Sequence, residues 1–231
     1  MAKEAPMQFL FPKALQGTRG RTAAVVGSID NDLEGNIVLR ISESLHFRGL
    51  FLHYTLEVGE QRGLVTKETL LEFLGKSAAI DPARLPIFER ALSAYFDRDY
   101  MVFIHLVIPQ MEEAIRNLME KQGVAVLKFK DNVFNLRTLD DILNEEAFKE
   151  LFGESGQDIQ TYMRVLLTDR KGWNVRNEVS HGLLPPEAFS KTMADWILHA
   201  VLLFGVVRDV QGEEHTPVEE QGESLPTEPG E

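Results

Sequence analysis

The stretch YMVFIHLVIPQMEEAIRNLMEK, residues 100–121, decides the fold class. Its first half, residues 101–108, is almost wholly apolar, which is typical of a helix buried on all sides. Pro109 predicts a kink, because proline lacks a backbone N–H and its ring crowds the preceding turn. The second half is amphipathic, and Glu112 and Arg116 form an i, i+4 pair. The stretch therefore predicts a central helix.

Helical spacing recurs along the rest of the chain. Between Asp32 and Glu57, apolar residues recur at three-, four- and seven-residue steps, as they do on one face of a helix. Gly49 lies inside that pattern and disfavours an unbroken helix. Capping residues predict further helix starts at Thr66, Asp81-Pro82, Thr138 with Asp141, Asn144 and Ser155. A run of apolar residues predicts a last long helix over 187–210.

Strand signals are few. Val124 to Leu136 alternates loosely and contains Asp131-Asn132, so it predicts one short hairpin. Six or more helices with at most one hairpin make the chain all-α. We expect four parts: an arm or loop over 1–30, an N-terminal helical extension over 31–96, the main helical bundle over 97–210, and a disordered acidic tail over 211–231.

Composition excludes several kinds of chemistry. The 231 residues include no cysteine, so disulfides, thiolate metal sites and cysteine nucleophiles are excluded. The first residues lack the apolar core of a signal peptide. The longest apolar run, Trp196 to Val207, is too short for a bilayer, which needs about 20 residues. We therefore expect a cytoplasmic protein with no membrane partner.

The net charge is −12, and the 21 residues from Gln211 contain seven Glu and no Lys or Arg. A negative chain does not bind polyanions over its whole surface. If the protein meets RNA, it must do so in a local pocket.

One stretch carries candidate chemistry: WNVRNEVSHG, residues 173–182. Arg176 can hold a phosphate in a planar two-pronged grip. His181 can move protons at neutral pH, since the unperturbed pKa of histidine is about 6.5. RNA supplies its own nucleophile, the 2′-hydroxyl. An enzyme must remove that proton, stabilise charge on the phosphate and protonate the leaving oxygen, and this pair suits those tasks with no metal or cofactor.

Spacing leaves open how the pair converges. Five residues along an ideal helix turn the chain by about 500°, so the two side chains point about 140° apart. Either the helix is short and distorted near Gly182, or two copies meet across a two-fold axis. Asn174 is a candidate N-cap, which places Arg176 in a first helical turn, where free backbone N–H groups favour anions.

This segment resembles the Arg-x4-6-His motif of the HEPN superfamily of helical ribonucleases and toxins, in which a polar residue such as Asn177 commonly follows the arginine. Residues 97–116 and the stretch LLTDRKG, residues 166–172, resemble a HEPN-like group that also occurs in proteins of endoplasmic-reticulum-associated RNA degradation. The resemblance implies a HEPN-like helical bundle, a homodimer and metal-independent cleavage that leaves a 2′,3′-cyclic phosphate. It implies catalysis by Arg176 and His181 with support from Asn177.

Other residues are assigned from charge and position alone. Arg170 and Lys171 are expected to guide the RNA backbone, and Asn174 to lie at the substrate. No cofactor or metal is expected. Asp30, Asp32 and Glu34 imitate the start of an EF-hand loop, but Ile41 stands where the bidentate Glu belongs, so helix capping is the better interpretation.

Alternatives stay open at this stage. Arg176 can instead pair with Glu178 or Glu112, and a histidine near a helix C-terminus is favoured by the dipole. His105 and His199 are expected in the core. The protein is then a non-catalytic module for dimerisation or RNA binding, or a regulatory partner of another protein. A catalytic protein would serve in RNA processing, as a toxin restrained by an antitoxin, or in phage defence.

Overall fold

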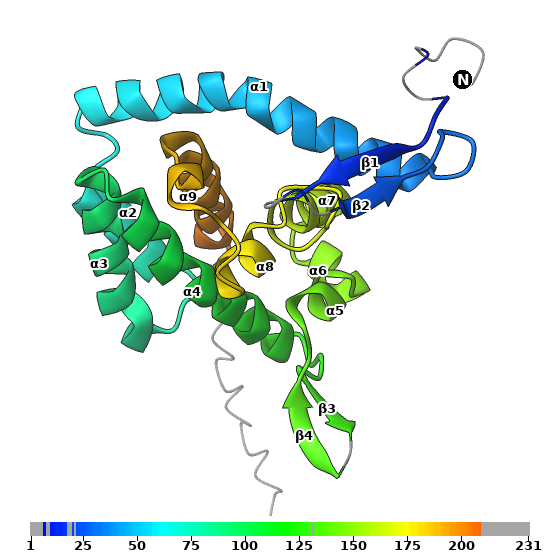
Figure 1. Ribbon diagram of the computed structural model, residues 1–231. Helices are drawn as coiled ribbons and strands as arrows, with labels where there is room; N and C mark the ends of the chain where they lie inside the picture. The colour runs from blue at the N-terminus through cyan, green and yellow to red at the C-terminus, as the bar shows by residue number, and fades with distance from the viewer. Residues whose placement is uncertain (1–6, 8–9, 18–19, 21, 131, 209–231) are drawn as a thin grey trace, which may run out of the picture.

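The fold is mostly helical, with two small antiparallel sheets. The computed structural model describes residues 7, 10–17, 20, 22–130 and 132–208. The helices in chain order are α1 (Leu33–Gln61), α2 (Lys67–Gly75), α3 (Leu85–Phe96), α4 (Tyr100–Lys121), α5 (Leu139–Leu143), α6 (Glu146–Glu150), α7 (Gly156–Leu167), α8 (Val175–Ser180) and α9 (Lys191–Gly205). Figure 1 shows how they are arranged.

The predicted central helix α4 organises the core. α3 packs along α4, and α9 lies between α4 and α1. Phe103, Ile104 and Ile115 of α4 are fully buried, as are Ile197 and Leu198 of α9. One hydrophobic cluster runs from α1 through α4 to α9, so the predicted extension and the main bundle share a core.

α1 is a continuous helix through Gly49 and lies along one side of the fold, against α9 and α7 (Figure 1). A Cβ on Gly49 would lie 2.9 Å from Cγ2 of Thr192 and 3.2 Å from Nε1 of Trp196. The glycine is therefore explained by the close approach of α9, and not by a break in the helix. The Asp32 carboxylate caps α1 by accepting from the backbone N–H of Gly35, as expected.

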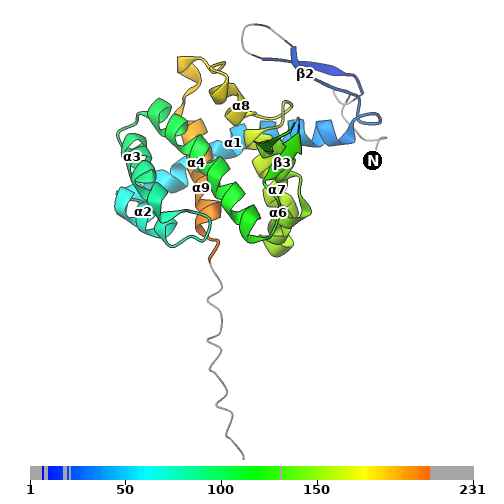
Figure 2. The same cartoon turned by 90° about the horizontal axis from the view of Figure 1, so that it is seen from below.

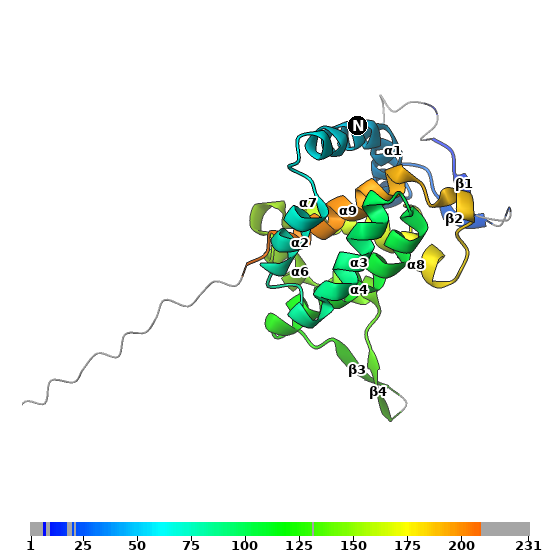
Figure 3. The ribbon, with the colours of Figure 1, turned by 90° about the vertical axis from the view of Figure 1, so that its left-hand side faces the viewer.

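The predicted hairpin is present as β3 (Leu127–Lys130) and β4 (Val133–Leu136). It projects from the helical body (Figures 1 and 3). A second hairpin, β1 (Lys13–Gln16) with β2 (Thr22–Val26), lies in the region expected to be loop. The prediction of at most one hairpin was therefore wrong, because backbone pairing forms there without clear alternation of apolar and polar residues.

Several local predictions are also corrected. Thr66 and Thr138 cap α2 and α5 as expected, but Ser155 makes no capping bond and Asn144 ends α5 without capping α6. The last helix begins at Lys191 and follows a short 3-10 turn, Pro186–Ala188. The tail prediction, 211–231, lies outside the described residues.

The first half of α4 is not buried all round. Met101 and Val102 are 40% and 36% exposed, and His105 is exposed and stacks on Phe189. His105 is therefore not a core histidine. His199 is partly buried and lies 3.1 Å from the Tyr162 hydroxyl. Among the described residues, no helix has the length and hydropathy needed to span a bilayer.

Candidate functional site

α8 carries the predicted motif and lies at the edge of the helical body (Figure 2). The loop before it turns sharply at Gly172, where a Cβ would lie 2.3 Å from the backbone oxygen of Val165. The backbone N–H of Trp173 donates to that same oxygen at 2.7 Å. Val175 is fully buried, so it anchors the start of α8 in the core. The neighbouring side chains are thereby held in fixed directions.

Arg176 reaches from α8 to α4. Its Nε and Nη2 donate to the two carboxylate oxygens of Glu112 at 2.9 and 3.2 Å, and its Nη1 donates to Oδ1 of Asn177 at 3.0 Å. The Glu112 side chain is 11% exposed and also pairs with Arg116. Of the two structural partners considered from sequence, Glu112 is the one observed. A guanidinium has five N–H groups, so these three bonds leave two for a ligand.

Asn174 and Asn177 fix the motif from within. Asn177 donates through Nδ2 to Oδ1 of Asn174 at 2.7 Å and lies 3.4 Å from the backbone oxygen of Thr168. Asn174 stands at the N-cap position but in the left-handed region, at φ 53°, and its side chain makes no capping bond. Asn174 is therefore the N-cap residue, as expected, and Arg176 lies in the first turn, but the side chain makes no capping bond because its amide is engaged by Asn177 and Glu178.

His181 ends the same helix. It occupies the C-cap position, and Gly182 follows with φ 62°, a conformation that glycine adopts without strain. The imidazole is exposed and has no hydrogen bond or ion pair with the described part of the chain. No hydrogen bond joins it to Arg176 in the described part of the chain.

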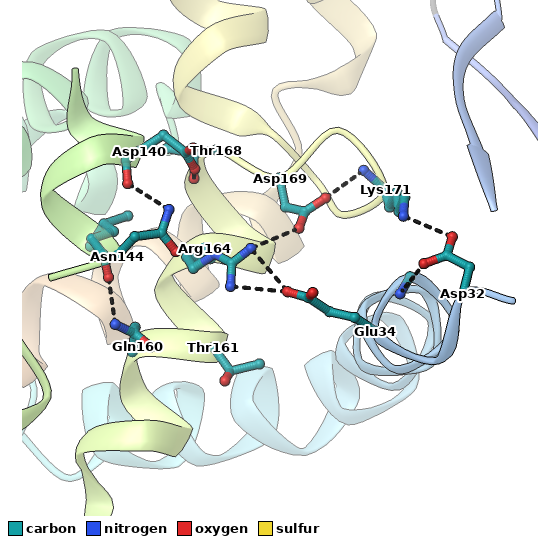
Figure 4. A network of polar contacts seen from close by, with 12 residues as sticks. Asp32, Glu34, Asp140, Asn144, Gln160, Thr161, Arg164, Thr168, Asp169 and Lys171 are labelled. Carbon is teal, nitrogen blue, oxygen red and sulfur yellow. Dashed lines mark hydrogen bonds and ion pairs between the residues drawn. The ribbon is translucent and has the colours of Figure 1, made fainter. Parts of the chain in front are cut away.

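The two predicted backbone guides lie in different settings. Arg170 is exposed. Lys171 donates from Nζ to Oδ2 of Asp32 at 2.8 Å and so ties the loop before α8 to the start of α1 (Figure 4). The hydrogen bond from Lys171, with backbone bonds from Gly27 and Gly35, lowers the pKa of Asp32. Lys171 is thus committed to an internal partner.

Figure 4 shows that this contact belongs to a larger network. Arg164 of α7 lies 3.3 Å from the Glu34 carboxylate and 3.7 Å from that of Asp169. Asp169 also accepts from the backbone N–H of Lys171 at 2.9 Å. These pairs connect α1 and α7 to the loop that leads into α8, and so they fix the start of α8.

A second polar cluster was not predicted. The Asp195 carboxylate on α9 is fully buried and accepts from the Tyr95 hydroxyl at 2.5 Å and from Lys191 Nζ at 2.9 Å. Nδ1 of His53, from α1, lies 3.2 Å from its other oxygen. Burial, and then the bond to Asp195, raise the pKa of Tyr95. The signal in the sequence was a single acid inside an apolar helix, four residues after a lysine.

The comparisons with known proteins add no relative: no family model, no curated protein and no solved structure matches this chain.

Proposed function

We propose that this protein is a HEPN-like endoribonuclease that cleaves RNA without a metal through Arg176 and His181. The supporting observation is the state of the two side chains. The Arg176 guanidinium is held in one orientation by Glu112 and Asn177, and two of its N–H groups have no partner among the described residues. His181 stands exposed at the other end of the same short helix, with no described partner.

The chemistry follows from these positions. One imidazole takes the proton of the 2′-hydroxyl, and the 2′-oxygen forms a bond to phosphorus. The remaining N–H groups of Arg176 donate to the phosphate oxygens and strengthen as negative charge develops. The bond from phosphorus to the 5′-oxygen breaks, and a second imidazole protonates that oxygen. The products are a 2′,3′-cyclic phosphate and a 5′-hydroxyl.

Two imidazoles require two copies of the chain. The motif holds one histidine per chain, so a two-fold axis beside α8 would supply an arginine and a histidine from each copy to one groove. We therefore propose that the active form is a homodimer, with RNA as the substrate. Its setting is RNA processing, phage defence or a toxin role with an antitoxin partner, and we place it in the cytoplasm.

A second candidate function is a non-catalytic HEPN-like dimerisation or binding module. It is favoured by one observation: one of the two sides of the guanidinium that can make a two-pronged grip, Nε with Nη2, is occupied by Glu112. In that case the Arg176–Glu112 pair is a structural bond between α8 and α4, and His181 is a surface histidine.

One experiment separates the two functions. End-labelled RNAs of several sequences are incubated with the full chain in EDTA, and products are tested for cyclic phosphate ends. The nuclease proposal predicts that Arg176→Ala and His181→Ala each lower the rate by about 10²-fold or more. Matched controls keep full activity: Arg137→Ala, an equally buried arginine paired with Glu145, and His105→Asn, an exposed histidine on α4.

The outcomes are distinct. Equal cleavage by wild type and both motif variants means that the activity lies elsewhere or is a contaminant. No cleavage of any RNA by folded wild type, with RNA binding retained, favours the binding module. Circular dichroism of each variant establishes that lost activity is not lost folding.

A further inference from the structure

A cavity of about 840 Å³ lies between one face of α4 and the segment that joins α2 to α3. This volume is within the usual range for a small-molecule site, about 300–1,000 Å³. Residues 75–82 line one side of it, and Arg208, which follows α9, lines it as well. The α4 residues that line it are spaced three and four apart, so they share one face of the helix: Gln110, Glu113, Ala114, Asn117 and Lys121.

Two side-chain amides on this face have hydrogen-bonding capacity left. Gln110 is 8% exposed, and its Oε1 accepts from Nη1 of Arg84 at 3.2 Å, whereas its Nε2 has no partner in the described part of the chain. Asn117 donates from Nδ2 to the backbone oxygen of Ala79 at 2.9 Å, which leaves its Oδ1 as an acceptor. Each amide is thus fixed at one end and can bind a ligand in the cavity at the other.

The charged groups that line the cavity favour an anion. Four cations and three carboxylates give the lining a formal charge of +1, in a chain whose net charge is −12: Lys76, Arg84, Lys121 and Arg208 with Asp81, Glu113 and Glu120. Lys121 and Arg208 donate to the backbone oxygens of residues 78 and 205, so their charges are fixed beside the cavity.

Arg84 is the cation best placed to bind a ligand. Its Nη1 lies beside the Gln110 amide, and its Nη2 lies 3.4 Å from the Glu113 carboxylate. The other oxygen of Glu113 lies 3.8 Å from Nη1 of Arg116. Arg84 can therefore turn to a ligand without leaving Glu113 unpaired, because Arg116 remains as its partner.

Glu113 also connects the cavity to the motif in α8. Arg116 pairs with Glu113 and with Glu112, and Glu112 accepts from Nε of Arg176 at 2.9 Å. A row of five alternating charges therefore runs from the cavity to the motif: Arg84, Glu113, Arg116, Glu112 and Arg176. The side chains of Arg116 and Glu112 are 15% and 11% exposed, so solvent and salt screen this part of the row only weakly.

We propose that the cavity binds a small phosphate monoester and that the row of charges transmits this binding to Arg176. A phosphate monoester has three terminal oxygens, which accept from the Arg84 guanidinium and from Nε2 of Gln110 together. A hydroxyl group of the ester donates to Oδ1 of Asn117.

The transmission follows from the sharing of partners along the row. When Arg84 turns to the phosphate, Glu113 draws Arg116 toward itself. Glu112 then loses part of its bond to Arg116 and holds Arg176 more tightly. Slower RNA cleavage is the expected consequence, and it rests on the proposed function, whereas the binding and its transmission to Arg176 do not.

Binding is tested by isothermal titration calorimetry of the full chain with ribose 5-phosphate, adenosine 5′-monophosphate and inorganic phosphate. Wild type is expected to bind at least one ester with a dissociation constant below about 1 mM. Gln110→Glu should raise this constant by about tenfold or more, because it keeps the acceptor for Arg84 but replaces the donor with a negative charge. Arg84→Met should have the same effect. Gln157→Glu makes the same change at an exposed glutamine of α7 and should bind as wild type does.

Three results overturn the proposed site. They are no binding of any ester by folded wild type, an equal loss of affinity in Gln110→Glu and Gln157→Glu, and tighter binding of inorganic phosphate than of either ester. Circular dichroism of each variant establishes that lost binding is not lost folding.

Transmission is tested by NMR on the Nε–Hε signal of Arg176, which is identified by its loss in Arg176→Lys. A saturating concentration of the tighter ester should shift this signal in wild type. Glu113→Gln should abolish the shift, because it interrupts the row but keeps Arg84 and Gln110. Glu120→Gln is the matched control, since Glu120 also lines the cavity but is not part of the row, and it should keep the shift.

An unshifted signal in wild type with the ester bound overturns the transmission, as does an equal shift in the two glutamate variants. Neither the calorimetry nor the NMR measurement needs RNA cleavage. Failure of the nuclease proposal and failure of this site are therefore separate results.

Discussion

Two buried carboxylates tie distant helices together in this fold, and they differ in what surrounds them. Asp195 is fully buried and joins α9 to α1 and α3 through His53, Tyr95 and Lys191. Glu112 is 8% exposed and joins α4 to α8 through Arg176. In the first, the closed cluster, the carboxylate is fully buried; in the second, the open cluster, the Arg176 side chain is 26% exposed on a helix at the edge of the body.

The difference separates a structural role from a candidate chemical one. Both oxygens of Asp195 have partners from the same chain, and Lys191 and Tyr95 are held against each other as well. Arg176 keeps unused donors and is about a quarter exposed. A charged cluster with a shifted pKa is therefore not sufficient evidence of a functional site. Solvent access and unused hydrogen-bonding capacity decide whether a cluster can bind a ligand.

The largest expected effect is at the closed cluster. Asp195→Ala leaves the partly buried Lys191 ammonium without its carboxylate and the buried Tyr95 hydroxyl without its acceptor. We expect the free energy of unfolding to fall by about 3–5 kcal/mol. Urea denaturation measures it. Asp97→Ala, at an exposed aspartate, should stay within about 0.5 kcal/mol of wild type. Equal values for the two variants would show that the cluster contributes nothing to stability.

A smaller loss is expected at the open cluster. Arg176→Met should cost about 1–3 kcal/mol, because Glu112 keeps Arg116 as a partner and Arg176 is partly solvated. A double-mutant cycle with Glu112→Leu isolates the pair. The double variant should be less destabilised than the sum of the single changes. Strict additivity would mean that the Arg176–Glu112 bond has no net value, which removes the argument for a structural role.

The sequence predicted those parts of the fold that depend on neighbours in the chain. α4, the caps at Thr66 and Thr138, and the β3–β4 hairpin follow from spacing, side-chain capping and turn residues. The sequence did not determine which carboxylate pairs with Arg176. Glu178 was the nearer candidate, but Glu112, 64 residues away, lies against it in the fold.

Burial was the harder quantity to predict. The apolar first half of α4 indicated a helix covered on all sides, yet His105 is exposed and stacks on Phe189 from the segment after α8. On α1, too, the apolar residues Phe47 and Phe51 are 66% and 64% exposed. Apolar spacing shows which faces can be buried, whereas tertiary packing or a partner decides which faces are.

A partly buried histidine gives a third point of comparison. Burial lowers the pKa of His199, one helical turn after Asp195 on α9. A group whose pKa is depressed on folding binds protons more tightly when unfolded, so stability is present above the unfolded value and falls with pH below it. Wild type should therefore lose stability below about pH 6.5, by at most about 1.4 kcal/mol per pH unit from this group.

The check is urea denaturation of wild type and His199→Gln across that range. The variant should show a shallower loss between neutral and mildly acidic pH, because its side chain does not titrate. His105→Gln, at an exposed histidine, should keep the wild-type slope. If both variants keep it, the acid sensitivity arises from groups other than His199.

The smallest effect is expected at the Lys171–Asp32 ion pair, which is more exposed than the Asp195 and Glu112 clusters. Lys171→Met removes the bond to Asp32, whose side chains are 28% and 23% exposed, so we expect a loss of about 0.5–1 kcal/mol near neutral pH. Because the pKa of Asp32 is lowered in the folded state, that stabilisation is present above the usual value of 3.8 and is lost as the pH falls through the folded pKa. The difference from wild type should vanish in strong acid.

Lys149→Met is the matched control, since Lys149 is 26% exposed but its partner Glu146 is 72% exposed. A loss at Lys149 equal to that at Lys171 would mean that fixing the loop before α8 contributes no more than any surface pair, and the support proposed for the motif would rest on Gly172 and Val175 alone.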